Sequence, residues 1–246
     1  MLIKAKTLAG CRLDALDGAL GSVGDLLFDD RFWTVRYLVA DTGGWLAERD
    51  VLISPYAVAS VDGDERTVSV DLSKRQIEDS PGLDSHKPVS RQFEESYHSY
   101  FGWPAYWGGM LPWGGVAYLE RTRKHWDDVG ARERWDPDLR STRDVAGHEV
   151  RATDGEIGHI EDFLVDDETW TIRYLVVATR NWWPGKKVIV SPLWIDSFSW
   201  SESRVQVGLT REEVRNSPEY SDVSVLSREY EASLHGHYNR LGYWDG

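Results

Sequence analysis

The longest repeated feature of this sequence is a segment at residues 17–40 that returns, 137 positions later, at residues 154–177. Both copies contain Asp-Gly, a further glycine, an Asp-Asp pair and the run Trp-Thr-(Val/Ile)-Arg-Tyr-Leu-Val. The same spacing persists at two later Ser-Pro dipeptides and at His98 and His235. Solenoid proteins repeat every 20–50 residues or so. A period of this length therefore indicates two copies of a whole domain in tandem.

Composition limits the class of protein. The 246 residues allow each copy to bury a core, and the contents of hydrophobic (41%) and charged (28%) residues are typical of globular proteins. The net charge of −13 disfavours nucleic acid and anionic lipid as partners, because phosphates are bound by Lys and Arg. Cys11 is the sole cysteine, so no disulfide within the chain is expected. The first residues lack the apolar run of a secretory signal, and we expect a cytoplasmic location.

Short apolar segments separated by turn residues predict a mainly β fold. β-branched and aromatic residues favour strands over helices, and Asp-Gly, Asp-Asp and Gly-Gly sequences favour the turns between them. In the first copy the expected strands are residues 23–28, 33–40, 51–53, 58–61 and 67–70. Closely spaced short strands of this kind are typical of a small barrel.

A short helix is expected to follow each barrel. Ser73 and Gln76 have the spacing of a capping box, the aligned residues of the second copy repeat it, and a Ser-Pro dipeptide follows each time. Each copy then carries an aromatic appendix, at residues 86–107 and 223–246. Aromatic side chains at three-to-four spacing predict a helix at the start of each appendix, packed against the parent barrel.

The chain is thus expected to consist of two barrel units and a linker. The first unit is predicted at residues 1–107, with its barrel at about 5–85. The second is predicted at residues 142–246, with its barrel at about 142–222. The linker at residues 108–141 is rich in Gly and Trp at first and then mixed in charge.

The boundary between the first appendix and the linker is free of charge. Residues 101–119 contain no charged residue, and a stretch of this length could cross a bilayer. Five glycines and two prolines in this stretch argue against a membrane helix, because they leave backbone groups unpaired in hydrocarbon. We expect no transmembrane segment.

No catalytic motif, metal site or cofactor site is expected, because the chain has no nucleophile elbow, phosphate loop or dinucleotide fingerprint. We interpret Asp29 and Asp30 as turn formers, with a divalent-ion site as the alternative. Arg36 in mid-strand is interpreted as the partner of a carboxylate, with ligand binding as the alternative. For His98 and His235 we expect hydrogen-bonded imidazoles in aromatic packing, with metal binding as the alternative.

The repeated motif resembles the PRC-barrel family, a small β-barrel named for the cytoplasmic domain of the photosynthetic reaction-centre H subunit. A related barrel forms the C-terminal part of a bacterial ribosome-maturation factor. The resemblance covers about 5–85 and 142–222, and the chain looks like bacterial proteins with two such barrels. It implies two tandem small PRC-type β-barrels. The motif residues, for which structural roles are expected, are Gly21, Asp29, Asp30, Trp33, Arg36, Tyr37 and Pro55, and Gly158, Asp166, Asp167, Trp170, Arg173, Tyr174 and Pro192.

The resemblance further implies a non-catalytic adaptor barrel that contacts a protein or ribonucleoprotein partner. Our leading hypothesis is a protein-interaction module, with candidate contact residues in and near the uncharged stretch: Trp103, Tyr106, Trp107 and Trp113. The alternative role for these aromatic side chains is filling the space between the barrels. Two alternative functions stay open, namely binding of a small ligand or metal ion between the barrels and self-assembly into a homo-oligomer.

Overall fold

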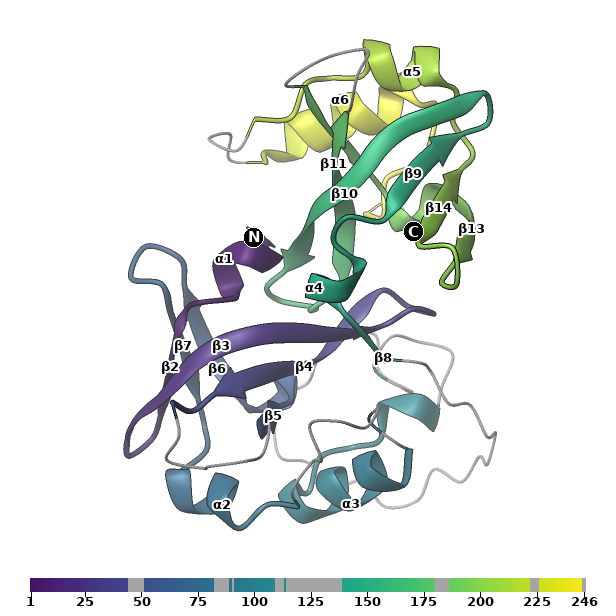
Figure 1. The fold of residues 1–246 in the computed structure, drawn as a ribbon. Coiled ribbons are helices and arrows are strands. Elements are labelled where there is room, and N and C mark those ends of the chain that lie inside the picture. Colours follow the sequence, from purple (N-terminus) through teal and green to yellow (C-terminus); the bar gives the residue numbers. More distant parts are fainter. Residues whose placement is uncertain are drawn as a thin grey trace. The chain divides into compact units, whose positions relative to one another are not determined.

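The computed structural model of the chain describes residues 1–43, 51–81, 89, 91–108, 113, 139–179, 186–221 and 226–244. The Gly43-Gly44 turn beyond Gly43, and the linker apart from Gly108, Trp113 and residues 139–141, lie outside this range. The chain divides into two compact units (Figure 1). Unit 1 comprises Met1, Ile3–Arg143 and Val165–Ile172, and unit 2 comprises Leu2, Asp144–Leu164 and Arg173–Gly246.

The sheet of unit 1 has the strand order β5-β4-β3-β2-β7-β6, with β8 paired to β3. All these pairings are antiparallel except the parallel pair β2 and β7. The strands are β2 (Arg12–Ala15), β3 (Gly18–Asp29), β4 (Thr34–Asp41), β5 (Val51–Ile53), β6 (Val58–Asp62), β7 (Thr67–Val70) and β8 (Leu139–Ser141). Every predicted strand of the first copy is present, and β3 is longer than predicted because it begins directly after the Asp17 turn.

The sheet of unit 2 repeats this topology in the order β12-β11-β10-β9-β14-β13, with β1 (Leu2–Lys4) paired to β10. The pair β9 and β14 is parallel, as is its counterpart in unit 1. The strands are β9 (Glu149–Ala152), β10 (Gly155–Asp166), β11 (Ile172–Thr179), β12 (Lys187–Val190), β13 (Ile195–Ser199) and β14 (Arg204–Val207). The fold is therefore mainly β, with one small barrel domain built twice. Each barrel is preceded by one helical turn, α1 (Ala5–Leu8) and α4 (Thr142–Val145).

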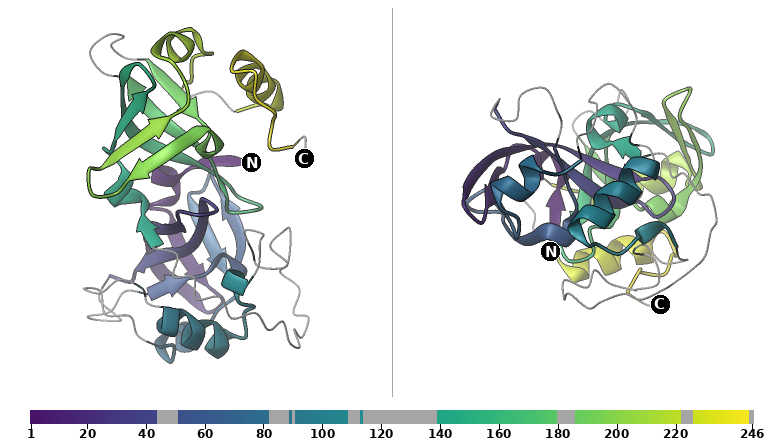
Figure 2. Two further views of the ribbon diagram at one scale, coloured as in Figure 1. Left: turned by 90° about the vertical axis from the view of Figure 1, so that its right-hand side faces the viewer. Right: turned by 90° about the horizontal axis from the view of Figure 1, so that it is seen from below.

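Two helices follow the strands in each unit. In unit 1 they are α2 (Lys74–Glu78) and α3 (Arg91–Phe101), which lie on the same side of the sheet in Figures 1 and 2. Both capping boxes predicted from the sequence are formed, at Ser73 before α2 and at Thr210 before α5 (Arg211–Asn216). The appendix helices α3 and α6 (Arg228–His237) are also present where the aromatic spacing predicted them.

The helix pair is tied together in the same way in each unit. Tyr100 Oη on α3 donates to the carbonyl of Gln76 on α2 at 3.1 Å. At the aligned positions of unit 2, His237 Nε2 lies 2.8 Å from the carbonyl of Glu213. The repeat thus extends from the strands to the contact between their covering helices.

The turn between the two long strands has the same backbone in both copies. Trp33 (φ 52°) and Trp170 (φ 58°) are both left-handed, which is uncommon for a bulky residue. Each turn is held by an aspartate, since Asp29 Oδ1 accepts from Phe32 N at 2.6 Å and Asp166 Oδ1 accepts from Glu168 N at 3.0 Å. This is the turn chemistry that the sequence indicates.

Unit 1 also contains β8, from the end of the linker, and the turn Val165–Ile172, from the second copy of the repeat. Strand β8 pairs with the end of β3, and the turn Val165–Ile172 packs against the start of β4. Val35 N donates to Trp170 O at 2.8 Å, and Ile172 N donates to Trp33 O at 2.6 Å. These backbone hydrogen bonds bring the two left-handed tryptophans to one place in unit 1.

A glycine in each long strand allows a close backbone approach. A Cβ atom at Gly158 in β10 would overlap the carbonyl oxygen of Ala178 in β11, and one at Gly21 in β3 would overlap the carbonyl of Asp41 in β4. The pairing of each long strand with its other neighbour, β9 for β10 and β2 for β3, shifts register next to the glycine. Glycine is therefore required at the position where the backbone of each bulged strand comes closest to the backbone of the neighbouring strand.

Gly158→Ala is expected to destabilise unit 2 by about 3 kcal/mol, because backbone atoms must move apart to accept the methyl group. The matched control is Gly236→Ala in α6, where the new Cβ meets nothing within 4 Å and a helix-favouring residue is gained. Hydrogen exchange of β10 and β11 measures the effect. Equal exchange in the two variants would contradict the steric argument.

Candidate functional site

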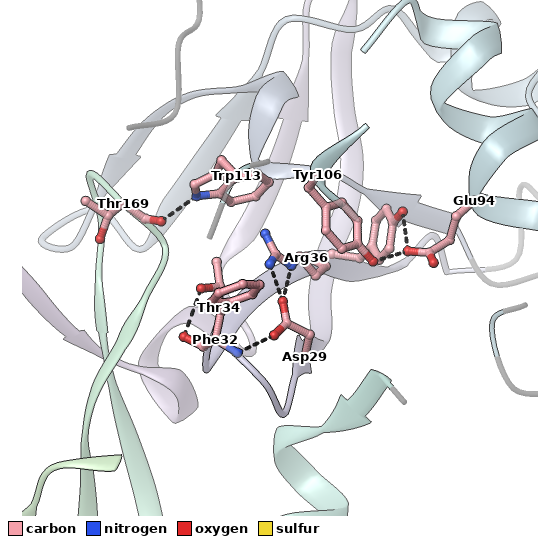
Figure 3. A network of polar contacts seen from close by, with 9 residues as sticks. Asp29, Phe32, Thr34, Arg36, Glu94, Tyr106, Trp113 and Thr169 are labelled. Carbon is pink, nitrogen blue, oxygen red and sulfur yellow. Dashed lines mark hydrogen bonds and ion pairs between the residues drawn. The ribbon is translucent and has the colours of Figure 1, made fainter. Parts of the chain in front are cut away.

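A buried ion pair lies at the end of the long hairpin in unit 1. Arg36 on β4 pairs through Nε and Nη2 with Asp29 Oδ2 on β3, and the two side chains are 0% and 1% exposed. Figure 3 shows the carboxylate held between this guanidinium and the turn amide of Phe32. Asp30, the neighbouring acid, instead pairs with Arg140 at 3.4 Å. The two aspartates thus point to different partners, as expected for turn residues.

The Arg36 guanidinium is covered by two aromatic rings. Its central carbon lies 4.0 Å from the ring centroid of Tyr106 and 4.8 Å from that of Trp113 (Figure 3). Trp113 Nε1 donates to the carbonyl of Thr169 at 2.9 Å. Arg36 Nη1 has no hydrogen-bond acceptor among the described residues. The faces of the two rings therefore supply part of the electrostatic compensation for this buried cation.

A polar network joins the appendix helix to the barrel. Tyr37 Oη donates to Glu94 Oε1 at 2.9 Å and lies 3.0 Å from Nε2 of His98. Tyr106 Oη donates to the same oxygen of Glu94. His98 Nδ1 lies 3.0 Å from the carbonyl of Pro104. One buried carboxylate therefore joins the strand tyrosine to the appendix tyrosine, and the strand tyrosine also contacts the helix histidine.

The same network exists in unit 2. Tyr174 Oη donates to Glu231 Oε1 at 3.0 Å and lies 3.0 Å from His235 Nε2. Tyr243 Oη donates to Glu231 Oε1 at 3.0 Å, and His235 Nδ1 lies 2.9 Å from the carbonyl of Leu241. Each appendix is therefore fastened to its own barrel by the same four side chains.

The environment of these tyrosines keeps them protonated. Burial raises the pKa of Tyr37 well above its ordinary value, and the Glu94 carboxylate raises that pKa further. Burial raises the pKa of Tyr174 in the same way, with Glu231 as the next cause. A phenol that stays protonated acts as a hydrogen-bond donor and supplies no nucleophile at neutral pH. The arrangement fixes the appendix in place.

The histidines occupy the aromatic environment predicted for them. The His98 ring lies 5.0 Å from that of Trp107, and the His235 ring lies 5.0 Å from that of Trp244. Within the described part of the chain, no group of three or more His, Cys, Asp or Glu residues could hold a metal ion. Cys11 is buried in unit 1, where its thiol donates to the carbonyl of Thr7 at 3.0 Å and burial raises its pKa.

The four candidate contact residues have different degrees of burial. Tyr106 and Trp113 are each 2% exposed and belong to the interior of unit 1, which removes them as surface contacts of the folded unit. Trp103 is half-buried, with its ring stacked 4.4 Å from that of Phe101. Trp107 is half-buried beside His98. The Tyr106 and Trp113 rings pack over the Arg36 guanidinium. The sequence pattern does not reveal that this buried cation needs aromatic side chains to cover it.

The remaining motif residues have structural positions. Pro55 and Pro192 begin short 3₁₀ turns, η1 (Pro55–Ala57) and η3 (Pro192–Trp194), and the preceding serines cap these turns. Asp167 Oδ1 accepts from the terminal ammonium of Met1. Glu94 and Glu231, which organise the two networks, were not singled out from the sequence. Their signal was available, because they are identical residues at the repeat spacing on the aromatic helices.

Comparison with known proteins gives one family. A family model described as PRC-barrel domain matches residues 13–77 and 137–204, which together exceed half of the chain. No curated protein matches. Among the helices that the structure describes, none combines the length and hydropathy needed to cross a membrane.

Proposed function

The chain belongs to the PRC-barrel family, and on that premise we propose that it is a non-catalytic module that binds a protein partner. The observation that carries the proposal is the duplicated Tyr-Glu-His-Tyr network. These are the residue types from which acid–base sites are made, and in both units they join the appendix to the barrel. The tyrosine, glutamate and histidine side chains that could serve in acid–base chemistry therefore have a structural role in both units.

The charge of the chain favours a protein over a polyanion as the partner. A net charge of −13 repels phosphate backbones and anionic lipid surfaces. A protein partner can present apolar and cationic side chains. The cationic ones would pair with acidic residues of this chain, and the apolar ones would pack against an exposed leucine. Such a leucine is present in unit 2, where Leu193 is 74% exposed.

The proposal is tested by quantitative capture with the full chain as bait, from membrane and soluble fractions of the source cells. We expect one protein to be retained at a constant ratio, and the purified pair to give a defined complex in light scattering. Retention that persists after nuclease treatment excludes an RNA bridge. The absence of any protein above a tag-only control in both fractions would overturn the proposal.

A further inference from the structure

The histidine of each polar network has a hydrogen-bond acceptor at one ring nitrogen. In unit 2, His235 Nδ1 lies 2.9 Å from the carbonyl oxygen of Leu241. A backbone carbonyl can only accept, so this contact requires a proton on Nδ1. In a neutral imidazole the other nitrogen, Nε2, then has a lone pair and can only accept. A neutral ring at this position therefore needs a hydrogen-bond donor at Nε2.

The group at Nε2 is a tyrosine whose hydroxyl proton has another acceptor. Tyr174 Oη lies 3.0 Å from His235 Nε2 and donates to Glu231 Oε1 at 3.0 Å. Burial raises the pKa of Tyr174, so the hydroxyl keeps its one proton, which can serve only one of the two contacts. With this proton directed to Glu231, the contact with His235 is a hydrogen bond only when Nε2 donates. Both ring nitrogens then carry protons, and the ring is an imidazolium.

The surroundings of Glu231 direct the tyrosine proton toward its carboxylate. Glu231 Oε1 also accepts from Tyr243 at 3.0 Å, and Oε2 pairs with Arg228 at 3.0 Å. The Arg228 cation attracts a charged carboxylate more strongly than a neutral acid, and hydrogen bonds to charged groups are the stronger ones. The shared proton of the network therefore belongs on the histidine.

The other groups around His235 accommodate a positive charge. Its ring lies 5.1 Å from that of Trp194 and 5.0 Å from that of Trp244, and aromatic rings can stabilise a nearby cation. Arg228 opposes the charge, but its side chain is 52% exposed, so solvent screens it. Among the described residues, the ionisable groups around this ring are Glu231 and Arg228 of α6, Tyr174 and Arg173 of β11, and Tyr243 of the C-terminal segment.

Unit 1 repeats the arrangement around His98. Its Nδ1 lies 3.0 Å from the carbonyl of Pro104, and its Nε2 lies 3.0 Å from Tyr37 Oη. Tyr37 donates to Glu94 Oε1 at 2.9 Å, so one hydroxyl proton again has two partners. Among the described residues, the ionisable groups around this ring are Glu94 of α3, Tyr37 and Arg36 of β4, Tyr56 of η1 and Tyr106 of η2 (Tyr106–Gly108).

We propose that each histidine acts as a protonated latch that fastens the appendix helix to its barrel, with His235 in unit 2 and His98 in unit 1. The latched ring donates to a barrel tyrosine and to a carbonyl of the appendix. Loss of one proton leaves a single proton for the two contacts of the tyrosine, so one of them becomes a repulsion between lone pairs. The latch is complete at pH values where a free histidine is charged, and it is lost as the pH rises and the latched ring gives up its proton.

The first test reads the protonation of each ring directly. Nitrogen NMR of the histidine side chains in the full chain distinguishes an imidazolium from a neutral ring with its proton on Nδ1. The internal control is His237, which is exposed on α6 and whose Nε2 lies 2.8 Å from the carbonyl of Glu213. We expect His235 and His98 to keep both ring protons at a pH where His237 has lost one. Neutral rings at His235 and His98 at that pH would show that the tyrosines give their proton to the histidines, and would overturn the inference.

The second test measures the hold on α6. At pH values where an exposed histidine is neutral, opening of the helix releases one proton. Its opening constant from hydrogen exchange, corrected for the chemical exchange rate, should therefore rise about tenfold for each pH unit. In Tyr174→Phe the hydroxyl that Nε2 faces is absent, so the helix should be less protected and this pH dependence should disappear. A flat profile in the wild type, or an equally steep one in Tyr174→Phe, would contradict the latch. The wild-type profile decides the matter by itself if Tyr174→Phe does not fold.

Discussion

Asp29→Ala is expected to lower the free energy of unfolding of unit 1 by about 3–5 kcal/mol. The substitution leaves the Arg36 guanidinium buried without its carboxylate, and Arg36 Nη1 has no other acceptor among the described residues. The rings of Tyr106 and Trp113 compensate only part of that charge. Native-state hydrogen exchange is the suitable measurement, because the two units need not unfold together. The loss should appear in β3, β4 and α3.

The repeat supplies the matched control for this prediction. Asp166→Ala removes the corresponding turn acceptor, but Asp166 and Arg173 are both only half-buried. Its effect should be about 1 kcal/mol, the usual range for a lost turn hydrogen bond. The difference between the two variants measures the cost of the buried charge. Equal losses would contradict the assignment of Arg36 as a buried cation that depends on Asp29.

A compensating substitution separates charge from packing. Asp29→Ala combined with Arg36→Met removes both charges and keeps an unbranched apolar side chain under the two rings. The double variant is expected to recover most of the lost stability, because an apolar pair of similar volume replaces a buried ion pair at little net cost. A double variant as unstable as Asp29→Ala would show that the carboxylate acts mainly through the turn amide of Phe32.

Glu94→Ala is expected to cost unit 1 about 3 kcal/mol and to release α3 from the barrel. The carboxylate is 1% exposed and accepts from both Tyr37 and Tyr106, so its removal leaves two buried hydroxyls without this acceptor. Each unsatisfied buried donor costs about 1–3 kcal/mol. Hydrogen exchange of α3 reports the release directly.

Two controls bracket this second prediction. Glu95→Ala changes the adjacent acid, which is exposed on the same helix, and should alter stability by less than about 0.5 kcal/mol. Glu231→Ala in unit 2 should release α6 in the same manner, with a smaller loss because Tyr243 is half-buried where Tyr106 is fully buried. If Glu94→Ala leaves α3 as protected as Glu95→Ala does, the network does not hold the appendix.

Much of the fold follows from the repeat and from local patterns. The strands after each turn, the capping boxes at Ser73 and Thr210, and the aromatic helices were predicted because short-range chemistry determines them. The placement of β8 and of the turn Val165–Ile172 in unit 1 was not predicted. These contacts join positions more than 100 residues apart, and no local pattern encodes such pairing.

The candidate site was less accessible to sequence reasoning. Arg36 was expected to pair with a carboxylate, and it does so with Asp29. The pattern did not show that Tyr106 and Trp113 cover this pair, because their sequence neighbours give no sign of burial.

Binding of a protein partner is tested most directly by a photo-crosslinking amino acid placed at position 193, with position 16 as the equally exposed control. The full chain carrying the label is irradiated in an extract of the source cells, and the crosslinked peptides are sequenced. We predict a single protein adduct at position 193 and no adduct of that protein at position 16. The absence of a protein adduct at both positions, or an adduct at position 16 alone, would contradict a binding role for the exposed face of unit 2.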